Sequence, residues 1–209
     1  DIITTAVAQQ QLRKNEEVII MPPRVKFSRE EIIAAALDIV RRGGMAALTA
    51  RSLAAELGSS AKPVFGLFEN MQEVQDEVVR AANAEYQSFL RAEMMRGAYP
   101  PYKASGIAYI AFARKEKELF KLLFMRDRTE EDSETEDESI DGIIALISRN
   151  TGLSNEDARL FHLEMWIFVH GIATMIVTGS LDWEEEYVSR TLTDVYEGLK
   201  ARWCGGNGK

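Results

Sequence analysis

The sequence predicts an all-α fold of about nine helices, and three observations support this prediction. Apolar residues recur at spacings of three and four, residues that cap helices precede many of the apolar runs, and no stretch alternates apolar and polar residues as a strand would. The chain has 209 residues, 46% hydrophobic and 28% charged, which is enough for a sizeable core. A single cysteine, Cys204, excludes a disulfide-stapled scaffold and a Cys-rich zinc module.

The predicted organisation has three parts. Residues 1–20 show no hydrophobic face of clear period and precede Met21, which is typical of a natural start, so we interpret them as an N-terminal extension or arm. Residues 21–70 form a small helical domain, and residues 71–209 form a larger one. The sequence needs no Gly/Pro linker, because one long helix could run from the first domain into the second.

The small domain contains three short predicted helices. Ser28-Arg-Glu-Glu31 is a capping-box pattern that starts a helix ending at Gly43-Gly44. Thr49 caps the second helix, which runs to Leu57 and is closed by Gly58. Ser60 starts a third, very short helix through about Phe65.

The larger domain contains six predicted helices. Asn70 caps a helix over 71–95, and further helices follow at about 103–114, 118–125, 140–151 and 154–178. Asp182 caps the last helix, which carries an apolar face. Residues 129–141 contain eight acidic side chains in 13 positions, a composition typical of a solvated loop.

The charge of the chain is unevenly distributed. The net charge is −8, which argues against a protein that coats nucleic acid over its whole surface. Residues 21–68 nevertheless hold seven basic against four acidic side chains, whereas residues 69–209 have a net charge of −10. The sequence therefore predicts a basic head on an acidic body.

Two short helices separated by a tight glycine turn at 49–65 are typical of a helix-turn-helix, whose second helix enters the DNA major groove. The same spacing also fits the start of a plain three-helix bundle. The residue pattern favours the first alternative. It comprises Ser28-Arg-Glu-Glu-Ile32, Ala35-Ala36-Leu37, Gly43, Leu48-Thr49, Leu53-Ala54, Leu57-Gly58, Ser60, Val64-Phe65, Phe68 and Val74, and over these roughly 50 residues the chain resembles the DNA-binding domain of tetracycline-repressor (TetR/AcrR) family regulators.

A second, shorter match lies in the body. The segment Met165-Trp166-Ile-Phe-Val-His170-Gly171-Ile172 resembles a Trp–His–Gly signature in the ligand-binding domain of one branch of this family. The resemblance implies a homodimer in which residues 154–200 supply two helices of a four-helix interface. It also implies a cytoplasmic regulator that binds a palindromic DNA operator and is released by an unknown small-molecule effector, with no membrane partner.

The resemblance implies DNA contacts from the head. We expect them from Arg24, Lys26, Thr49, Arg51, Ser59, Ser60, Lys62 and Phe65. The chain departs from the family at two positions: Phe65 replaces a tyrosine whose hydroxyl contacts a phosphate, and Met71 replaces a lysine with the same role. An all-helical interaction or scaffold protein that has lost DNA binding therefore remains the alternative.

In the body we expect aromatic side chains to line the effector site. The predicted ligand-binding residues are Tyr109, Phe112, Phe124, Trp166 and His170. Of the two histidines, His170 is predicted to be buried and hydrogen-bonded. No catalytic pattern, metal-ligand spacing or cofactor motif appears, so the sequence predicts neither an enzyme nor a cofactor.

The two long helices over 154–203 are predicted to mediate dimerisation, because they have more apolar surface than the acidic body can cover. The residues concerned are Leu163, Trp166, Ile167, Val169, Ile172 and Ile176. Gly171 costs about 1 kcal/mol relative to alanine inside a helix, so it predicts close backbone approach to a partner chain or a ligand. The longest strongly apolar stretch of the chain, Leu163–Val177, is predicted to be too short and too interrupted to span a membrane.

Overall fold

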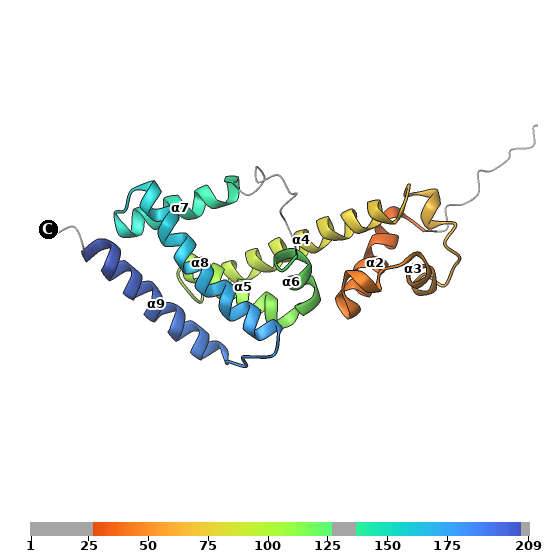
Figure 1. Cartoon of the computed structure of the whole chain (residues 1–209). Helices are drawn as coiled ribbons and strands as arrows, with labels where there is room; N and C mark the ends of the chain where they lie inside the picture. Colours follow the sequence, from red (N-terminus) through yellow and green to blue (C-terminus); the bar gives the residue numbers. More distant parts are fainter. Residues whose placement is uncertain (1–26, 127–136, 206–209) are drawn as a thin grey trace, which may run out of the picture.

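The computed structural model describes residues 27–126 and 137–205, and every regular element in these ranges is a helix (Figure 1). The predicted all-α fold is confirmed. The elements are α2 (Arg29–Gly43), η1 (Met45–Ala47), α3 (Ala50–Glu56), η2 (Val64–Gly66), α4 (Met71–Met95), α5 (Pro101–Lys115), α6 (Lys117–Phe124), α7 (Asp137–Thr151), α8 (Asn155–Val177) and α9 (Glu185–Gly205), where η denotes a 3-10 turn. The predicted extension 1–20, the arm residues Arg24 and Lys26, and residues 129–136 of the acidic block lie outside the described residues.

The head, residues 27–70, lies at one end of the molecule, and α4 continues from it into the body (Figure 1). One buried cluster includes side chains on both sides of the predicted domain boundary at residue 70, from Ile32 in α2 to Leu192 in α9. A smaller cluster lies between α7 and α8 and includes Ile147 and Phe161. The body therefore has two packing centres, and the first of them extends into the head.

The helix starts follow the capping residues predicted from the sequence. Ser28 Oγ accepts a hydrogen bond from Glu31 N at 3.2 Å, and Ser28 N donates to the Glu31 carboxylate at 2.7 Å, which completes the capping box. Thr49 caps α3 through Ser52, and Asn70 Oδ1 accepts from Glu73 N at 3.0 Å. These bonds satisfy N–H groups that a helix start leaves without partners.

The third head helix differs from the prediction. Residues 61–63 form a bend and a turn, and only Val64–Gly66 make a 3-10 turn. The amides of Val64 and Phe65 both donate to Ala61 O, at 3.1 and 3.3 Å, so one helical turn forms and is not continued. Pro63 lies inside this segment, has no amide hydrogen to donate and disfavours helical backbone at the residue before it. Fully buried Val64 fixes this turn to the head core.

The start of α9 also differs from the prediction, because the helix begins at Glu185 and Asp182 does not cap it. The first helical bond runs from Val188 N to Glu184 O at 3.1 Å. Asp182 instead forms an ion pair with Arg114 at 3.3 Å, and Arg114 also donates to the carbonyl of Trp183. Residues 181–184 form no regular element, and Trp183 among them packs against the main core before α9 begins.

Helix α8 has two apolar faces. Val169, Ile172 and Ile176 are at most 8% exposed and belong to the core of their own chain, so these three were wrongly predicted to face a partner. The opposite face leaves large side chains about half exposed. We call these side chains the α8 stripe: Leu160, Leu163, Trp166, Ile167 and Met175.

By length and composition α8 could cross a membrane. Helix α8 has 23 residues, because it extends N-terminally beyond the apolar stretch Leu163–Val177. The expectation that this segment is too short to span a membrane was therefore wrong. Its most apolar window is 39% buried against other helices, which leaves the α8 stripe as its apolar surface.

The attachment of α2 to α4 predicts a specific acid sensitivity. Arg29 donates to Leu67 O at 2.8 Å and pairs with Glu73 and Glu77 at 2.6 and 2.9 Å. Hydrogen bonds from Arg80 and Arg29 lower the pKa of Glu77 from 4.5 to about 2. A lowered pKa in the folded state stabilises the protein above pH 4.5, and this contribution is lost as the pH falls toward 2.

We therefore expect Glu77→Gln to lower the free energy of unfolding near neutral pH, with the difference from wild type shrinking between pH 4.5 and 2. Urea unfolding at a series of pH values measures this difference. Glu69→Gln, at an exposed carboxylate nearby, is the control. A difference from wild type that stays constant across the window would contradict the assignment.

Candidate nucleic-acid interface and ligand site

The basic side chains of the head divide into two groups. Arg29 and Arg41 pair with acidic residues of the body, and Arg42 pairs with Glu56 at 2.7 Å. Within the part of the chain that the structure describes, Arg51 and Lys62 are the head cations for which no ion pair is found. Both are exposed at α3 and the turn that follows it, so their charges are available to an anionic partner.

The predicted DNA-contacting residues lie on two consecutive segments of the head. Thr49 and Arg51 are at the start of α3, and Ser59, Ser60 and Lys62 lie in the following turn. The turn is fixed to the end of α3, because Gly58 N donates to Ala55 O at 3.1 Å and Ser59 N to Ala54 O at 2.9 Å. Gly58 has a φ of +57°, a left-handed conformation that glycine adopts without strain.

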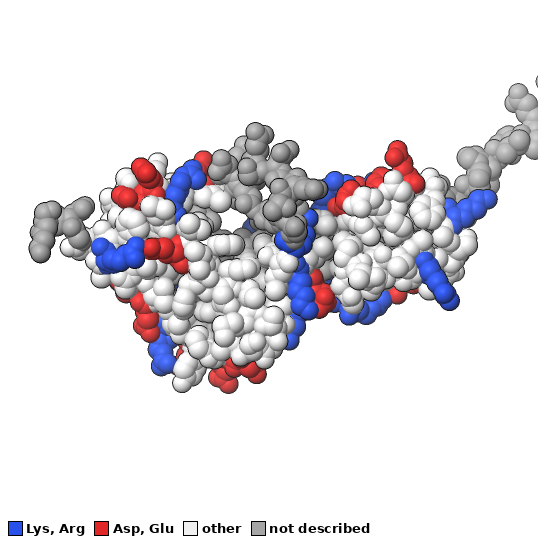
Figure 2. Space-filling view, in the orientation of Figure 1, with Lys and Arg blue, Asp and Glu red and all other residues white. Residues whose placement is uncertain are grey.

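Phe65 lies in η2, and its side chain is 45% exposed. Thr49 Oγ1 accepts from Ser52 N at 3.1 Å and remains exposed. The predicted contacts other than Arg24 and Lys26 therefore lie along one stretch of backbone. On the face shown in Figure 2, both basic and acidic side chains lie on the head, and uncharged side chains cover most of the adjoining body surface.

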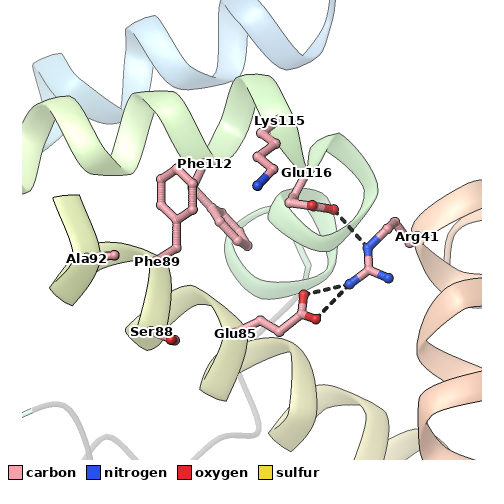
Figure 3. A pocket seen from close by; sticks show the side chains of 8 residues that line it. All are labelled: Arg41, Glu85, Ser88, Phe89, Ala92, Phe112, Lys115 and Glu116. Atoms are coloured by element: carbon pink, nitrogen blue, oxygen red, sulfur yellow. Dashed lines mark hydrogen bonds and ion pairs between the residues drawn. The ribbon is translucent and has the colours of Figure 1, made fainter.

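Sequence reasoning did not find the ion-pair cluster that joins the head to the body. The guanidinium of Arg41, on α2, donates to Glu85 Oε1 and Oε2 on α4 at 2.8 and 2.7 Å (Figure 3). It also donates to Glu116 at 3.0 Å, where α5 ends and α6 begins, and to Asp38 on its own helix. Glu85 and Glu116 are 44 and 75 residues away from Arg41 along the chain, and no local pattern connects them to it.

The predicted ligand-binding side chains form one aromatic cluster in the body. Tyr109 on α5 shares a hydrogen bond of 2.9 Å with His170 Nδ1 on α8, and its ring lies 4.9 Å from that of Phe124 on α6. Trp166 stacks on His170 at 5.0 Å with an interplanar angle of 14°. Phe112 is joined to the cluster through Tyr86, whose ring lies 5.2 Å away. The structure brings these rings into contact, so a ligand at this position would have to separate them.

Burial favours the neutral forms of the two titratable groups in this cluster. Burial lowers the pKa of His170 and raises the pKa of Tyr109. The prediction that His170 is hydrogen-bonded is confirmed, and the ring is partly buried. His162 forms an analogous pair with Tyr102 at 3.0 Å, two helical turns away. In the described ranges, no group of three or more His, Cys, Asp or Glu residues could hold a metal ion.

The described residues also line clefts beside the aromatic cluster, and two of them are considered in turn. The first, of about 300 Å³, lies where α2, α4 and α5 meet and includes Arg41, Phe89 and Phe112 in its lining. The second, of about 500 Å³, lies between α5 and the start of α9, over Ile107, Ala111 and Val188. Phe112 is the predicted ligand-binding residue that lines the first cleft.

Comparisons with known proteins identify relatives of both parts of the chain. The family model described as "Tetracyclin repressor-like, C-terminal domain" matches residues 102–196. An uncharacterized HTH-type transcriptional regulator of Mycobacterium tuberculosis is 27% identical over 169 residues, which cover 75% of this chain and 73% of that protein.

Two solved structures show the same fold. A TetR-like transcriptional regulator from Rhodococcus sp. RHA1 superposes with a TM-score of 0.57 at 15% identity, covering 90% of this chain and 100% of the other. The multidrug binding protein EbrR, complexed with malachite green, superposes with a TM-score of 0.55 at 20% identity, covering 83% of this chain and 98% of EbrR.

The ion-pair cluster predicts that substitutions of two neighbouring arginines change the free energy of unfolding by different amounts. Arg41→Met leaves three carboxylates without their shared cation, and we expect the free energy of unfolding to fall by about 1 kcal/mol, a value reduced because the group is partly exposed. Arg42→Met breaks one exposed pair and should change it by less than about 0.5 kcal/mol. Urea unfolding at a fixed protein concentration measures both changes. Equal effects of the two substitutions would show that the ion pairs of Arg41 contribute no more to stability than an ordinary surface ion pair.

Proposed function

The chain belongs to the tetracycline-repressor family of DNA-binding transcriptional regulators, and we propose that it is a cytoplasmic, ligand-responsive repressor that binds a palindromic operator as a homodimer. In this proposal residues 21–70 bind DNA, and residues 71–209 bind an effector and dimerise. The observation that carries the proposal is the exposed pair of head cations, Arg51 and Lys62, on a helix-turn-helix whose other described cations are paired.

The head is suited to bind the phosphate backbone. Arg51 and Lys62 supply charge, and the exposed hydroxyls of Thr49 and Ser60 supply hydrogen-bonding groups. Because the third head element is a single turn anchored by Val64, it presents few side chains to base edges. Arg24, Lys26, Ser59 and the exposed ring of Phe65 complete the proposed contact surface.

The α8 stripe is suited to a second copy of the chain. Its members recur three, four and seven residues apart, so they share one face of the helix, and Gly171 lies among them. A Cβ built at Gly171 meets no atom of its own chain within 4 Å, so any close approach there must come from another molecule. We expect α8 and α9 to bury well over the roughly 1,000 Å² typical of a biological interface.

The effector site is proposed at the aromatic cluster formed by Tyr109, Phe112, Phe124, Trp166 and His170. A ligand that inserts between these rings would displace α5, α6 and α8 relative to one another. Since α6 and α4 both contact α2, such a displacement reaches the head. The ligand would favour the arrangement with the lower operator affinity, which is a shift of population between two states.

The alternative function is an interaction or scaffold protein whose head no longer binds DNA. The observation that favours it is the loss of two phosphate partners: Phe65 has no hydroxyl, and Met71 packs against the head core. Binding to DNA that weakens with added salt separates the two functions, because phosphate contacts release counterions.

Lys62 provides the test of the DNA interface. We expect Lys62→Ala to weaken binding to all sequences and to make the salt dependence shallower by about one unit per half-site, as a phosphate contact predicts. Arg51→Ala should have the same effect. A titration of operator DNA over a salt series measures both quantities. If Lys62 instead contacts a base, the substitution should cost about 1–3 kcal/mol of binding free energy and relax the base preference at one position per half-site. No change in either affinity or salt dependence would exclude the turn from the interface.

Gly171 provides the test of the dimer. We expect Gly171→Leu to produce monomers or to abolish the response to the effector, because the new side chain occupies the space where the other molecule approaches. Gly142→Leu, at an exposed helical glycine of α7 that also has no neighbour within 4 Å, is the matched control and should remain dimeric. Light scattering at micromolar concentration measures the mass. A dimeric, fully responsive Gly171→Leu protein would make this glycine incidental.

A further inference from the structure

The head is attached to the body at both ends of α2. Arg29, in the first turn of this helix, pairs with two glutamates in the first two turns of α4. Arg41, near the other end, binds Glu85 further along α4 and Glu116 where α5 ends and α6 begins. Because the first attachment involves only the start of α4, the angle between the head and the rest of the body depends on what Arg41 binds.

The guanidinium of Arg41 uses all three of its nitrogens, each for a different carboxylate. Nε donates to Glu116 Oε2 at 3.0 Å, and Nη2 donates to both carboxylate oxygens of Glu85, at 2.8 and 2.7 Å (Figure 3). Nη1 donates to Asp38 on α2 itself. A guanidinium is planar and its N–H groups point in fixed directions, so these bonds hold α4 and the α5–α6 junction at set angles to α2.

Glu116 is a fixed point on the body. Its amide donates to Phe112 O at 2.7 Å at the end of α5, and its carbonyl accepts from Phe120 N at 2.8 Å at the start of α6. Phe112 and Phe120 are both buried, at 1% and 0% exposure. Arg41 therefore binds a carboxylate whose backbone cannot move without moving two helices.

The residue that ends α2 also lies close to α6. A Cβ built at Gly44 would lie 3.0 Å from Glu118 Oε2, and Gly44 has a φ of +72°, a conformation that glycine adopts without strain. No side chain at this position keeps the two helices apart. Without Arg41 its three carboxylates lose their shared cation, and like charges held so close repel one another. This repulsion would move α2 away from α6.

We propose that Arg41 is a positioning residue that sets the spacing of the operator half-sites, through its bonds to Glu85 and Glu116. The role rests on the proposed homodimer and its palindromic operator. The head lies at one end of the molecule, and α8 and α9 lie toward the other (Figure 1), so the angle of α2 on the body determines how far apart the two heads of a dimer lie.

The helical repeat of DNA makes half-site spacing a sensitive measure of this angle. One added base pair moves the second half-site by about 3.4 Å along the duplex and turns it by about a tenth of a turn. A head that Arg41 holds at one angle cannot follow such a step, whereas a head without these bonds can.

Selection from a random DNA pool tests the proposal with the full chain. Wild-type protein should enrich two inverted half-sites at one spacing, and duplexes with one base pair added or removed between them are then titrated. We expect Arg41→Met to bind the same half-site sequence and to lose at least fivefold of the wild-type preference for the original spacing. An unchanged preference overturns the role of Arg41 and leaves the operator function intact. A wild-type protein that enriches no paired half-sites overturns both.

Three further variants separate positioning from stability. Arg42→Met breaks an ion pair within the head, and Ile147→Val weakens a core cluster that contains no residue of α2, so both should keep the wild-type spacing preference. Glu116→Gln removes the charge at the α5–α6 junction and leaves Arg41 its other partners, so it should relax the preference in the same direction as Arg41→Met. A relaxed preference in either control, or an unchanged one in Glu116→Gln, overturns the proposal.

The separation of the heads provides a measurement that does not depend on DNA. Cys204 is the single cysteine, so Cys204→Ser combined with Glu69→Cys, at an exposed residue of the head, places one spin label on each chain. Pulsed electron–electron resonance between the two labels of a dimer should give a narrow distance distribution, and Arg41→Met should broaden or shift it. The same distribution with and without Arg41 overturns the proposal.

Discussion

Three carboxylates share the guanidinium of Arg41, and this cluster determines how the head is held on the body. Glu85 comes from α4 and Glu116 from the junction of α5 and α6, so one side chain of α2 binds two separate elements of the body. The Arg41 side chain is 32% exposed, and water screens its pairs. Such a cluster contributes modestly to stability, but its geometry allows few orientations of α2. Helix α2 also packs against α4 and α6, and we infer that the ion pairs of Arg41 fix the register of this packing.

Helix α8 connects the outer surface of the body to its interior. Val169 and Ile172 bind it to the core, while the α8 stripe remains exposed on the opposite side. Trp166 belongs to that stripe and stacks on His170, which is hydrogen-bonded to Tyr109 in the aromatic cluster. A change in the packing of this cluster therefore reaches the surface through two contacts. Dimerisation and effector binding, as proposed, would share these residues.

The head has few groups left over for a partner. Arg29, Arg41 and Arg42 are engaged within the chain, and the family's tyrosine and lysine positions hold Phe65 and Met71. The small number of available cations makes each of them more important. A head of this kind is expected to bind non-specific DNA weakly, because non-specific affinity depends on the number of phosphates neutralised.

The sequence by itself determined the features that depend on near neighbours. The starts of α2, α4 and α8 follow from Ser28, Asn70 and Ser154, because each cap bonds to an amide three residues away. The all-α class and the family resemblance follow from the same local patterns.

The tertiary structure alone decided the remaining features. Val169 and Leu163 are both apolar residues of one helix, and only the position of α5 and α9 decides which of them is buried. Residues 60–63 do not become helix, and α9 begins only after Trp183, which packs against the core. The ion pairs of Arg41 with Glu85 and Glu116 span 44 and 75 residues, and contacts over such separations depend on packing rather than on any pattern along the chain.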